Sequence, residues 1–96
     1  MILHTLNASP AQQAFADCLR LVAPGDHILL LGNGVYAALA DSPARARLDA
    51  CGAELHVLHR DAAAAGILAQ LDGAITVDMA GFVTLSERCS RQLAWF

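Results

Sequence analysis

The chain has a short apolar run at each of its two ends. Residues 1–6 and residues 92–96 both have the length of a β-strand, and polar or turn-forming residues bound each run, namely Ser9-Pro10 after the first and residues 86–91 before the second. A strand needs hydrogen-bonded neighbours, so both ends are predicted to be tied into a sheet. We therefore expect a single domain that spans residues 1–96.

Between these ends the pattern alternates between helix and strand. Ser9-Pro10-Ala11-Gln12 reads as a capping box that starts a helix, which continues with apolar residues at 3-and-4 spacing as far as Val22. Residues 24–26 end this helix. Residues 27–31 are apolar without alternation, as in a central strand that helices bury on both faces.

The remaining segments continue the alternation. We expect a short helix at 35–40, a helix capped by Ser42-Pro43 that stops at Gly52, a strand at 54–58, a helix at 62–70 weakened by Gly66, a strand at 74–77, a helix from 78 to about 90 and the closing strand. Five strands joined by helical crossovers predict a three-layer α/β/α fold with a mainly parallel five-stranded sheet, related to flavodoxin-like folds.

The composition limits the kinds of partner. The chain is 56% hydrophobic and only 16% charged, which is more apolar surface than so small a domain is expected to bury, so a contact with another subunit is predicted. A net charge of −3 and the lack of any lysine argue against direct binding of nucleic acid. No apolar run reaches the roughly 18 to 20 residues of a membrane span, and no signal-peptide pattern precedes residue 6, so a cytoplasmic protein is expected.

Three cysteines are the candidates for reactive groups. Cys18, Cys51 and Cys89 show neither CxxC spacing nor a repeated spacing with histidine, so no metal site is expected and free thiols are predicted. Cys18 lies on the apolar face of the first helix, where a core position is expected. Cys51 stands at a helix end. Cys89 has Arg88 and Arg91 nearby, which favour a thiolate, while its place at a helix C-terminus opposes one.

Ligands of open α/β sheets gather beyond the carboxyl ends of the strands. The residues expected on this rim are His4, Asn7, residues 32–34, residues 59–61 and Asp78. Ordinary roles in turns and helix caps are the alternative for each of them.

Residues 32–37 match the dinucleotide fingerprint G-x-G-x-x-A. The match follows the second strand instead of the first, its helix is broken at Ser42-Pro43, and Glu54 lies at the wrong end of the next strand to bind a ribose. The other interpretation is a tight turn with Asn33 or Gly34 in a left-handed conformation. A nucleophilic hydrolase is excluded because no G-x-S-x-G elbow is present.

Several stretches, in order and at near-constant spacing, resemble the TusB/DsrH family of small sulfur-relay subunits. They are LHTLN with Ser9-Pro10, Cys18-Leu19-Arg20, Leu29-Leu30-Leu31 with GVYAA at 34–38, Val77-Asp78 with GFVTL at 81–85, and QLAW at 92–95. The resemblance implies a DsrE/DsrF/DsrH-like fold and assembly with TusC/DsrF-like and TusD/DsrE-like subunits into a heterohexamer. Such complexes pass persulfide sulfur between carrier proteins, either for 2-thiolation of the tRNA wobble uridine or for sulfur oxidation.

The chain departs from the family pattern in two places. Gly32-Asn33 stands where relatives often have an acidic pair, and no cysteine follows the third or fourth strand to match the active cysteine of DsrE-type subunits. Cys18 matches a cysteine of DsrH-type members. The expected function is that of a mainly structural, non-catalytic subunit of a sulfurtransferase complex without a cofactor. The alternatives are a direct persulfide carrier, through Cys18 or less readily Cys89, and a nucleotide-binding flavodoxin-like domain.

Overall fold

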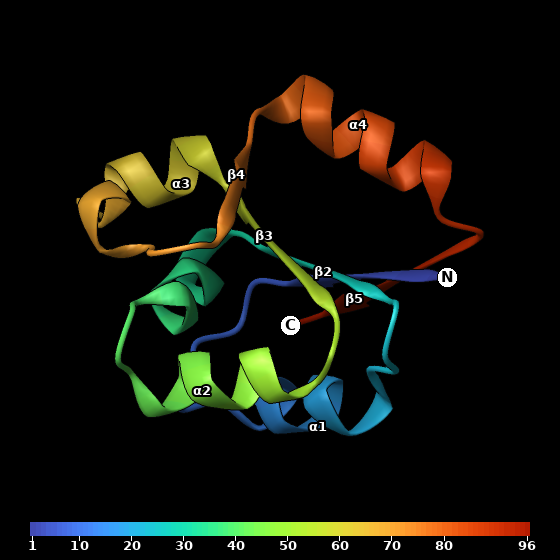
Figure 1. The fold of residues 1–96 in the computed structure, drawn as a ribbon, viewed down its shortest axis with the longest axis horizontal. Coiled ribbons are helices and arrows are strands. Elements are labelled where there is room, and N and C mark those ends of the chain that lie inside the picture. The colour runs from blue at the N-terminus through green and yellow to red at the C-terminus, as the bar shows by residue number, and fades with distance from the viewer.

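The fold is built on a five-stranded sheet in which all neighbouring strands are parallel, in the order β4-β3-β2-β1-β5. The computed structural model describes all residues from 1 to 96 (Figure 1). The elements are β1 (Ile2–Leu6), α1 (Gln13–Leu21), β2 (His27–Leu30), the 3-10 helix η1 (Gly32–Ala38), α2 (Pro43–Ala50), β3 (Glu54–Leu58), α3 (His59–Ala64), the 3-10 helix η2 (Leu68–Gln70), β4 (Ile75–Val77), α4 (Met79–Arg88) and β5 (Arg91–Trp95). No helix has the length and apolar character needed to cross a membrane.

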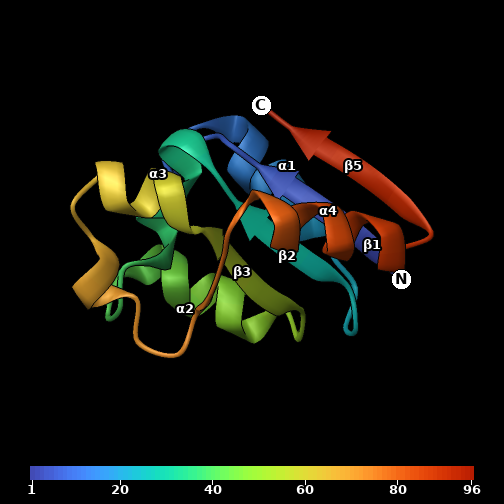
Figure 2. The same ribbon diagram turned by 90° about the horizontal axis from the view of Figure 1, so that it is seen from above.

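Both ends of the chain lie in the sheet, as their apolar runs predict. β1 and β5 are neighbours, with Ile2 opposite Arg91 and Leu6 opposite Trp95 (Figure 2). The backbone amide of Ser90 and its hydroxyl both donate to the carbonyl of Met1, at 3.1 and 3.0 Å. These bonds fix the register of the closing strand against the first.

β2 is the central strand, with β1 on one side and β3 on the other, and all four of its residues are buried. The unbroken apolar run is explained by this position, because helices cover both faces of the sheet (Figure 1). The predicted three-layer α/β/α arrangement with a parallel sheet is confirmed.

The two faces carry cores of different size. On the face covered by α1 and α2, Phe15, Cys18 and Leu48 belong to one cluster with the strand residues Leu30 and Val57. On the opposite face α4 is the main cover, and the buried cluster consists of Leu3, Leu29 and Leu85. Partly buried Val77, Phe82 and Cys89 pack against this smaller cluster.

The first helix begins later than predicted. Gln12 Oε1 accepts from the amide of Ser9 at 2.8 Å, so one half of the capping box forms. The Gln12 amide, however, donates to the backbone carbonyl of Ser9 and closes a turn, and the backbone of Gln12 is extended with ψ of 151°. Helical geometry therefore starts at Gln13, after a turn over residues 9–12.

The sequence predicts a turn at residues 32–34 followed by a short helix at 35–40. In the structure residues 32–34 are themselves helical. Residues 32–38 form η1, and Gly32, with φ of +54°, takes the left-handed conformation that was expected at Asn33 or Gly34. Gly34 is required for another reason: a Cβ atom there would lie 2.2 Å from the carbonyl oxygen of Leu6. η1 therefore packs directly on the end of β1.

The third helical segment also differs from the prediction of one helix over 62–70. α3 starts immediately after β3, at His59, and ends at Ala64. Gly66 has φ of +74°, which stops the helix, and Leu68–Gln70 then form the separate turn η2. The predicted Ser42 cap is confirmed, since its hydroxyl accepts from Arg45 N at 3.1 Å, and the Asp78 carboxylate caps α4 by accepting from Gly81 N at 2.7 Å.

Candidate functional site

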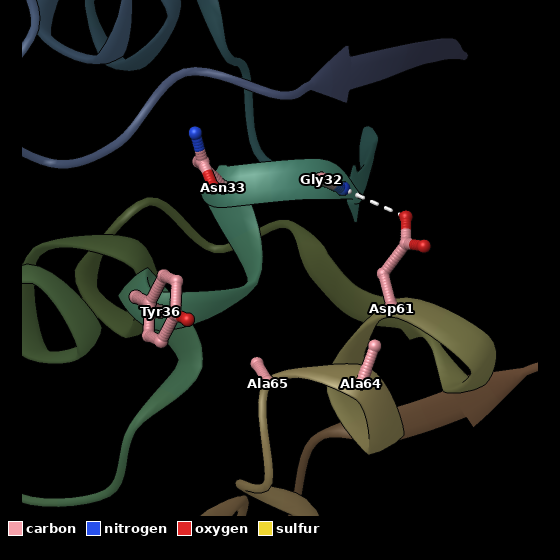
Figure 3. A pocket seen from close by; sticks show the side chains of 6 residues that line it. All are labelled: Gly32, Asn33, Tyr36, Asp61, Ala64 and Ala65. Atoms are coloured by element: carbon pink, nitrogen blue, oxygen red, sulfur yellow. Dashed lines mark hydrogen bonds between the residues drawn. The ribbon is translucent and has the colours of Figure 1, made fainter.

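A hollow of about 220 Å³ lies at the carboxyl end of the sheet, between η1 and α3. Figure 3 shows its lining residues, which are Gly32, Asn33, Tyr36, Asp61, Ala64 and Ala65. This is the rim where the sequence predicts a ligand edge, and it brings two of the predicted segments, 32–34 and 59–61, into contact.

Asp61 closes one side of this hollow. Its Oδ2 accepts from the amide of Gly32 at 2.8 Å, the bond drawn in Figure 3. In a dinucleotide site that amide would face a phosphate, and here a carboxylate occupies the place and would repel one. The glycine segment also leads into a 3-10 helix instead of an α-helix. The geometry therefore gives no support to the nucleotide-binding alternative.

The other predicted rim residues do not converge on the hollow. Asn7 lines a smaller depression of about 70 Å³ beside Trp95 and Phe96. Asp78 is the N-cap of α4, and His59 is exposed in the first turn of α3. The prediction for His4 was wrong: it lies within β1 and is fully buried, because its side chain points into the larger core.

His4 on β1 contacts β5 and the turn that precedes β2 through two hydrogen bonds. Trp95 Nε1 lies 3.2 Å from His4 Nδ1, and the two rings stack with centroids 6.3 Å apart. An indole N–H can only donate, so His4 Nδ1 accepts and Nε2–H donates to Asp26 Oδ2, at 3.1 Å. The stretches LHTLN and QLAW thus meet in one buried network, and their role is to fix β1 against β2 and β5.

Asp26 anchors this network at the amino end of β2. Burial by itself raises the pKa of its carboxyl, but hydrogen bonds from the Ala23 amide, His4 and the Ile2 amide outweigh burial and hold the pKa below its usual range. The sequence analysis missed Asp26, because it stands in a turn beside Pro24-Gly25, and nothing local connects it with a histidine 22 residues earlier.

Cys18 is fully buried in the larger core, on the face of α1 that its apolar spacing predicts. Burial raises the pKa of its thiol to about 12, and the neighbouring Cys51 adds to the shift. The thiol is therefore uncharged at neutral pH and out of contact with solvent.

The other two thiols are partly exposed. Burial raises the pKa of Cys51, an effect that the Arg47 guanidinium partly offsets, and Cys51 Sγ donates to the Arg47 carbonyl at 3.3 Å. Cys89 follows α4 and packs against the smaller core. Neither residue lies in the rim segments around Gly32 or Asp61.

Large apolar side chains are exposed on the α4 side of the molecule. Met79 and Val83, one turn apart on α4, are 47% and 54% exposed, and Ile75 on β4 is 44% exposed. Parallel sheets are normally covered on both faces, so the exposure of the strand residue Ile75 shows that this side of the sheet is incompletely covered within the single chain.

The chain is similar to known proteins over nearly its whole length. The family described as "DsrH like protein" matches residues 8–92. Protein TusB of Cronobacter sakazakii is 43% identical over 95 residues, covering 98% of this chain and all of that protein, and protein TusB of Sodalis glossinidius is 40% identical over the same shares. The crystal structure of the ychN protein from E. coli superposes with a TM-score of 0.71 at 15% identity, covering 97% of both chains, which shows a shared fold. The chain therefore belongs to the TusB/DsrH family.

Proposed function

We propose that this chain is a structural subunit of a cytosolic sulfurtransferase complex that relays persulfide sulfur between carrier proteins. Membership of the TusB/DsrH family supports the sulfur-relay role. The partners proposed are a TusC/DsrF-like and a TusD/DsrE-like subunit in a heterohexamer. The destination of the sulfur is either the 2-thiolated wobble uridine of tRNA or a sulfur-oxidising pathway.

The observation that carries the structural role is the placement of the thiols. In sulfur relay, a thiolate of the acceptor attacks the outer sulfur of a donor persulfide, the S–S bond breaks, and the donor leaves as a thiolate. The acceptor sulfur must therefore be ionised and accessible. The rim segments 32–34 and 59–61 contain no cysteine, and Cys18 is buried with a raised pKa. The alternative of a persulfide on Cys18 would require α1 to move off the sheet.

The apolar surface around α4 supports the proposed assembly. Met79, Val83 and Ile75 are exposed beside a face of the sheet that α4 covers only in part. Burying such side chains against a neighbouring subunit removes apolar area from water, and exposed apolar surface commonly marks interfaces.

The test is to assemble the complex with a variant in which all three cysteines are replaced, Cys18→Ala, Cys51→Ser and Cys89→Ser. Persulfide transfer by the assembled complex is expected to stay within about twofold of the unmodified complex. As the matched control, replacing the active cysteine of the DsrE-like partner should abolish transfer. Intact folding is checked first by circular dichroism, because Cys18 is a core residue.

Alkylation of the native chain tests the thiols separately. At pH 8 a thiol with a pKa of about 12 is ionised in only about one molecule in ten thousand, so iodoacetamide should leave Cys18 unmodified until the protein unfolds. Cys51 and Cys89, which are partly exposed, should react before Cys18. A persulfide found on Cys18 or Cys89 by mass spectrometry after loading, with loss of transfer when that residue alone is replaced, would refute the structural role.

A further inference from the structure

Three side chains with metal-binding atoms meet at the amino end of the sheet, at the opposite edge from the hollow of Figure 3. The register of β2 against β3 pairs His27 with Glu54 and Leu29 with His56. Paired residues share a face of a parallel sheet, and so do residues two apart on one strand. His27, Glu54 and His56 therefore all project from the α4 side of the sheet.

The potential ligand atoms are close together. His27 Nδ1 lies 3.1 Å from His56 Nε2, and His56 Nε2 lies 3.3 Å from Glu54 Oε1. One such atom from each of the three residues falls within 4.8 Å of the others. His27 and His56 are 3% and 5% exposed, whereas the Glu54 side chain is 50% exposed. The cluster thus has two fixed imidazoles and one carboxylate that is free to adjust.

The tautomer of His27 follows from its other neighbour. His27 Nε2 lies 3.1 Å from the sulfur of Met1, which can accept a hydrogen bond but cannot donate one. The proton of a neutral His27 is therefore on Nε2, and the lone pair of Nδ1 faces His56.

Protein atoms alone do not satisfy His56. If its proton is on Nε2, it reaches either His27 Nδ1 or the Glu54 carboxylate, and Nδ1 of His56 is a buried atom without a partner. If the proton is on Nδ1, then His56 Nε2, His27 Nδ1 and the Glu54 carboxylate all present lone pairs to one another. No positive group lies between these three atoms. A cation at their centre would pair with all three, whereas Nδ1 of His56 has no protein partner in either tautomer and does not decide between them.

The spacing fits a bound metal ion. Nitrogen and oxygen ligands at about 2.0 to 2.1 Å from a tetrahedral Zn²⁺ are about 3.4 Å from one another. The 3.1 and 3.3 Å separations at His56 are already near this value, and the mobile Glu54 side chain can close the remaining gap.

We propose that His27, Glu54 and His56 form a binding site for one divalent transition-metal ion of the zinc type. Two imidazoles and a carboxylate favour Zn²⁺ and its neighbours over Mg²⁺ or Ca²⁺, which prefer all-oxygen sites. Three protein ligands leave a coordination position for water or for a group from a partner. The positive charge of nearby Arg88 opposes binding of a cation. This side chain is exposed, however, and can turn into solvent. The inference is independent of the proposed sulfur-relay function.

The experiment is calorimetric titration of the full chain with Zn²⁺ after EDTA treatment, in the presence of a reductant. We expect one ion per chain and a rise in Tm on saturation. His56→Gln should weaken binding by at least about a hundredfold, since even indirect ligand partners contribute ten- to a hundredfold. Glu54→Gln should weaken it by about tenfold. His59→Gln, which changes an exposed histidine at the other end of β3, is the matched control and should bind normally.

Cobalt provides a second readout. The absorption spectrum of Co²⁺ in the same site should show nitrogen and oxygen ligation without thiolate charge-transfer bands. If His56→Gln does not fold, Glu54→Gln remains decisive because that side chain is half exposed. The proposal is overturned if the chain binds no ion at a stoichiometry of one, if Glu54→Gln and His59→Gln bind equally, or if thiolate bands appear.

Discussion

The two faces of the sheet differ in how much they bury and in what they leave exposed. The cluster under α1 and α2, which extends to η1 and α3, has 14 buried residues, whereas the cluster under α4 has three. The larger core therefore provides most of the hydrophobic stabilisation within the single chain. The α4 side instead leaves Ile75, Met79 and Val83 exposed, against Leu21 alone on α1 and α2, and holds the His27–Glu54–His56 cluster. The face under α1 and α2 therefore contributes most to stability, and the α4 side carries the exposed apolar side chains and the proposed metal site.

The largest effect should come from the larger core. Phe15 on α1 is fully buried, and Phe15→Ala should lower the free energy of unfolding by about 3 to 5 kcal/mol, through lost burial and the remaining cavity. Urea denaturation of the isolated chain measures this. A loss below about 1.5 kcal/mol would mean that the larger core does not dominate stability.

The corresponding change on the other face should cost less. Leu85 on α4 is 3% exposed, and Leu85→Ala should cost about 2 to 3 kcal/mol, near the low end for such replacements, because a small cluster next to solvent can collapse into the space. The two variants are compared in the same urea titration. A greater loss for Leu85→Ala than for Phe15→Ala would reverse the assignment of the two faces.

A substitution of Trp95 tests the hydrogen bond between β5 and β1 that Trp95 forms with His4. Trp95→Phe keeps an aromatic ring but removes the N–H that donates to His4 Nδ1, a buried acceptor. An unpaired buried acceptor is expected to cost about 1 to 2 kcal/mol. Thermal unfolding measures the loss, and Phe96→Leu, at a side chain that is 81% exposed, is the control. Equal stability of both variants would show that the bond contributes little.

The smallest effect on the isolated chain should come from the exposed side chains of α4. The double variant Met79→Ser with Val83→Ser should change the free energy of unfolding by no more than about 0.5 kcal/mol per site. Its affinity for the DsrF-like and DsrE-like subunits, measured by sedimentation, should fall at least about tenfold.

Leu21 offers a matched control for that experiment. It is 61% exposed on α1, which covers the opposite face, so Leu21→Ser should leave assembly unchanged. If Leu21→Ser weakens assembly and the α4 double variant does not, the partner binds the face of the larger core.

Strong local patterns were enough to predict most of the fold. The run at 27–31 predicts the central strand, and residues 54–58 coincide with β3. Short runs of β-branched and apolar residues between turn signals are typical of strands. The helix after β3 was misplaced because it starts without a capping signal directly from the strand, at His59. Similarly, the hydrogen bond from the Gln12 amide to the Ser9 carbonyl closes a turn, so α1 starts later in the sequence than predicted.

The sites were harder to predict because they depend on contacts between distant strands. Position 4 follows the strand pattern, but only the pairing with β2 and β5 shows that His4 contacts Asp26 and Trp95. The cluster of His27, Glu54 and His56 likewise depends on the register of β2 and β3. Counting cysteine spacings could not reveal it. The two-residue spacing of Glu54 and His56 was the one local signal available.

The pairing of β1 with β5 has a consequence for folding during synthesis. Ile2 opposes Arg91, so the most extensive strand contact of the first segment joins positions from opposite ends of the sequence. Contacts of such high sequence separation form slowly and late. Until the last strand is available, β1 presents an unpaired edge, which another chain can occupy. Before β5 has paired, β1 is therefore open to pairing with the wrong strand.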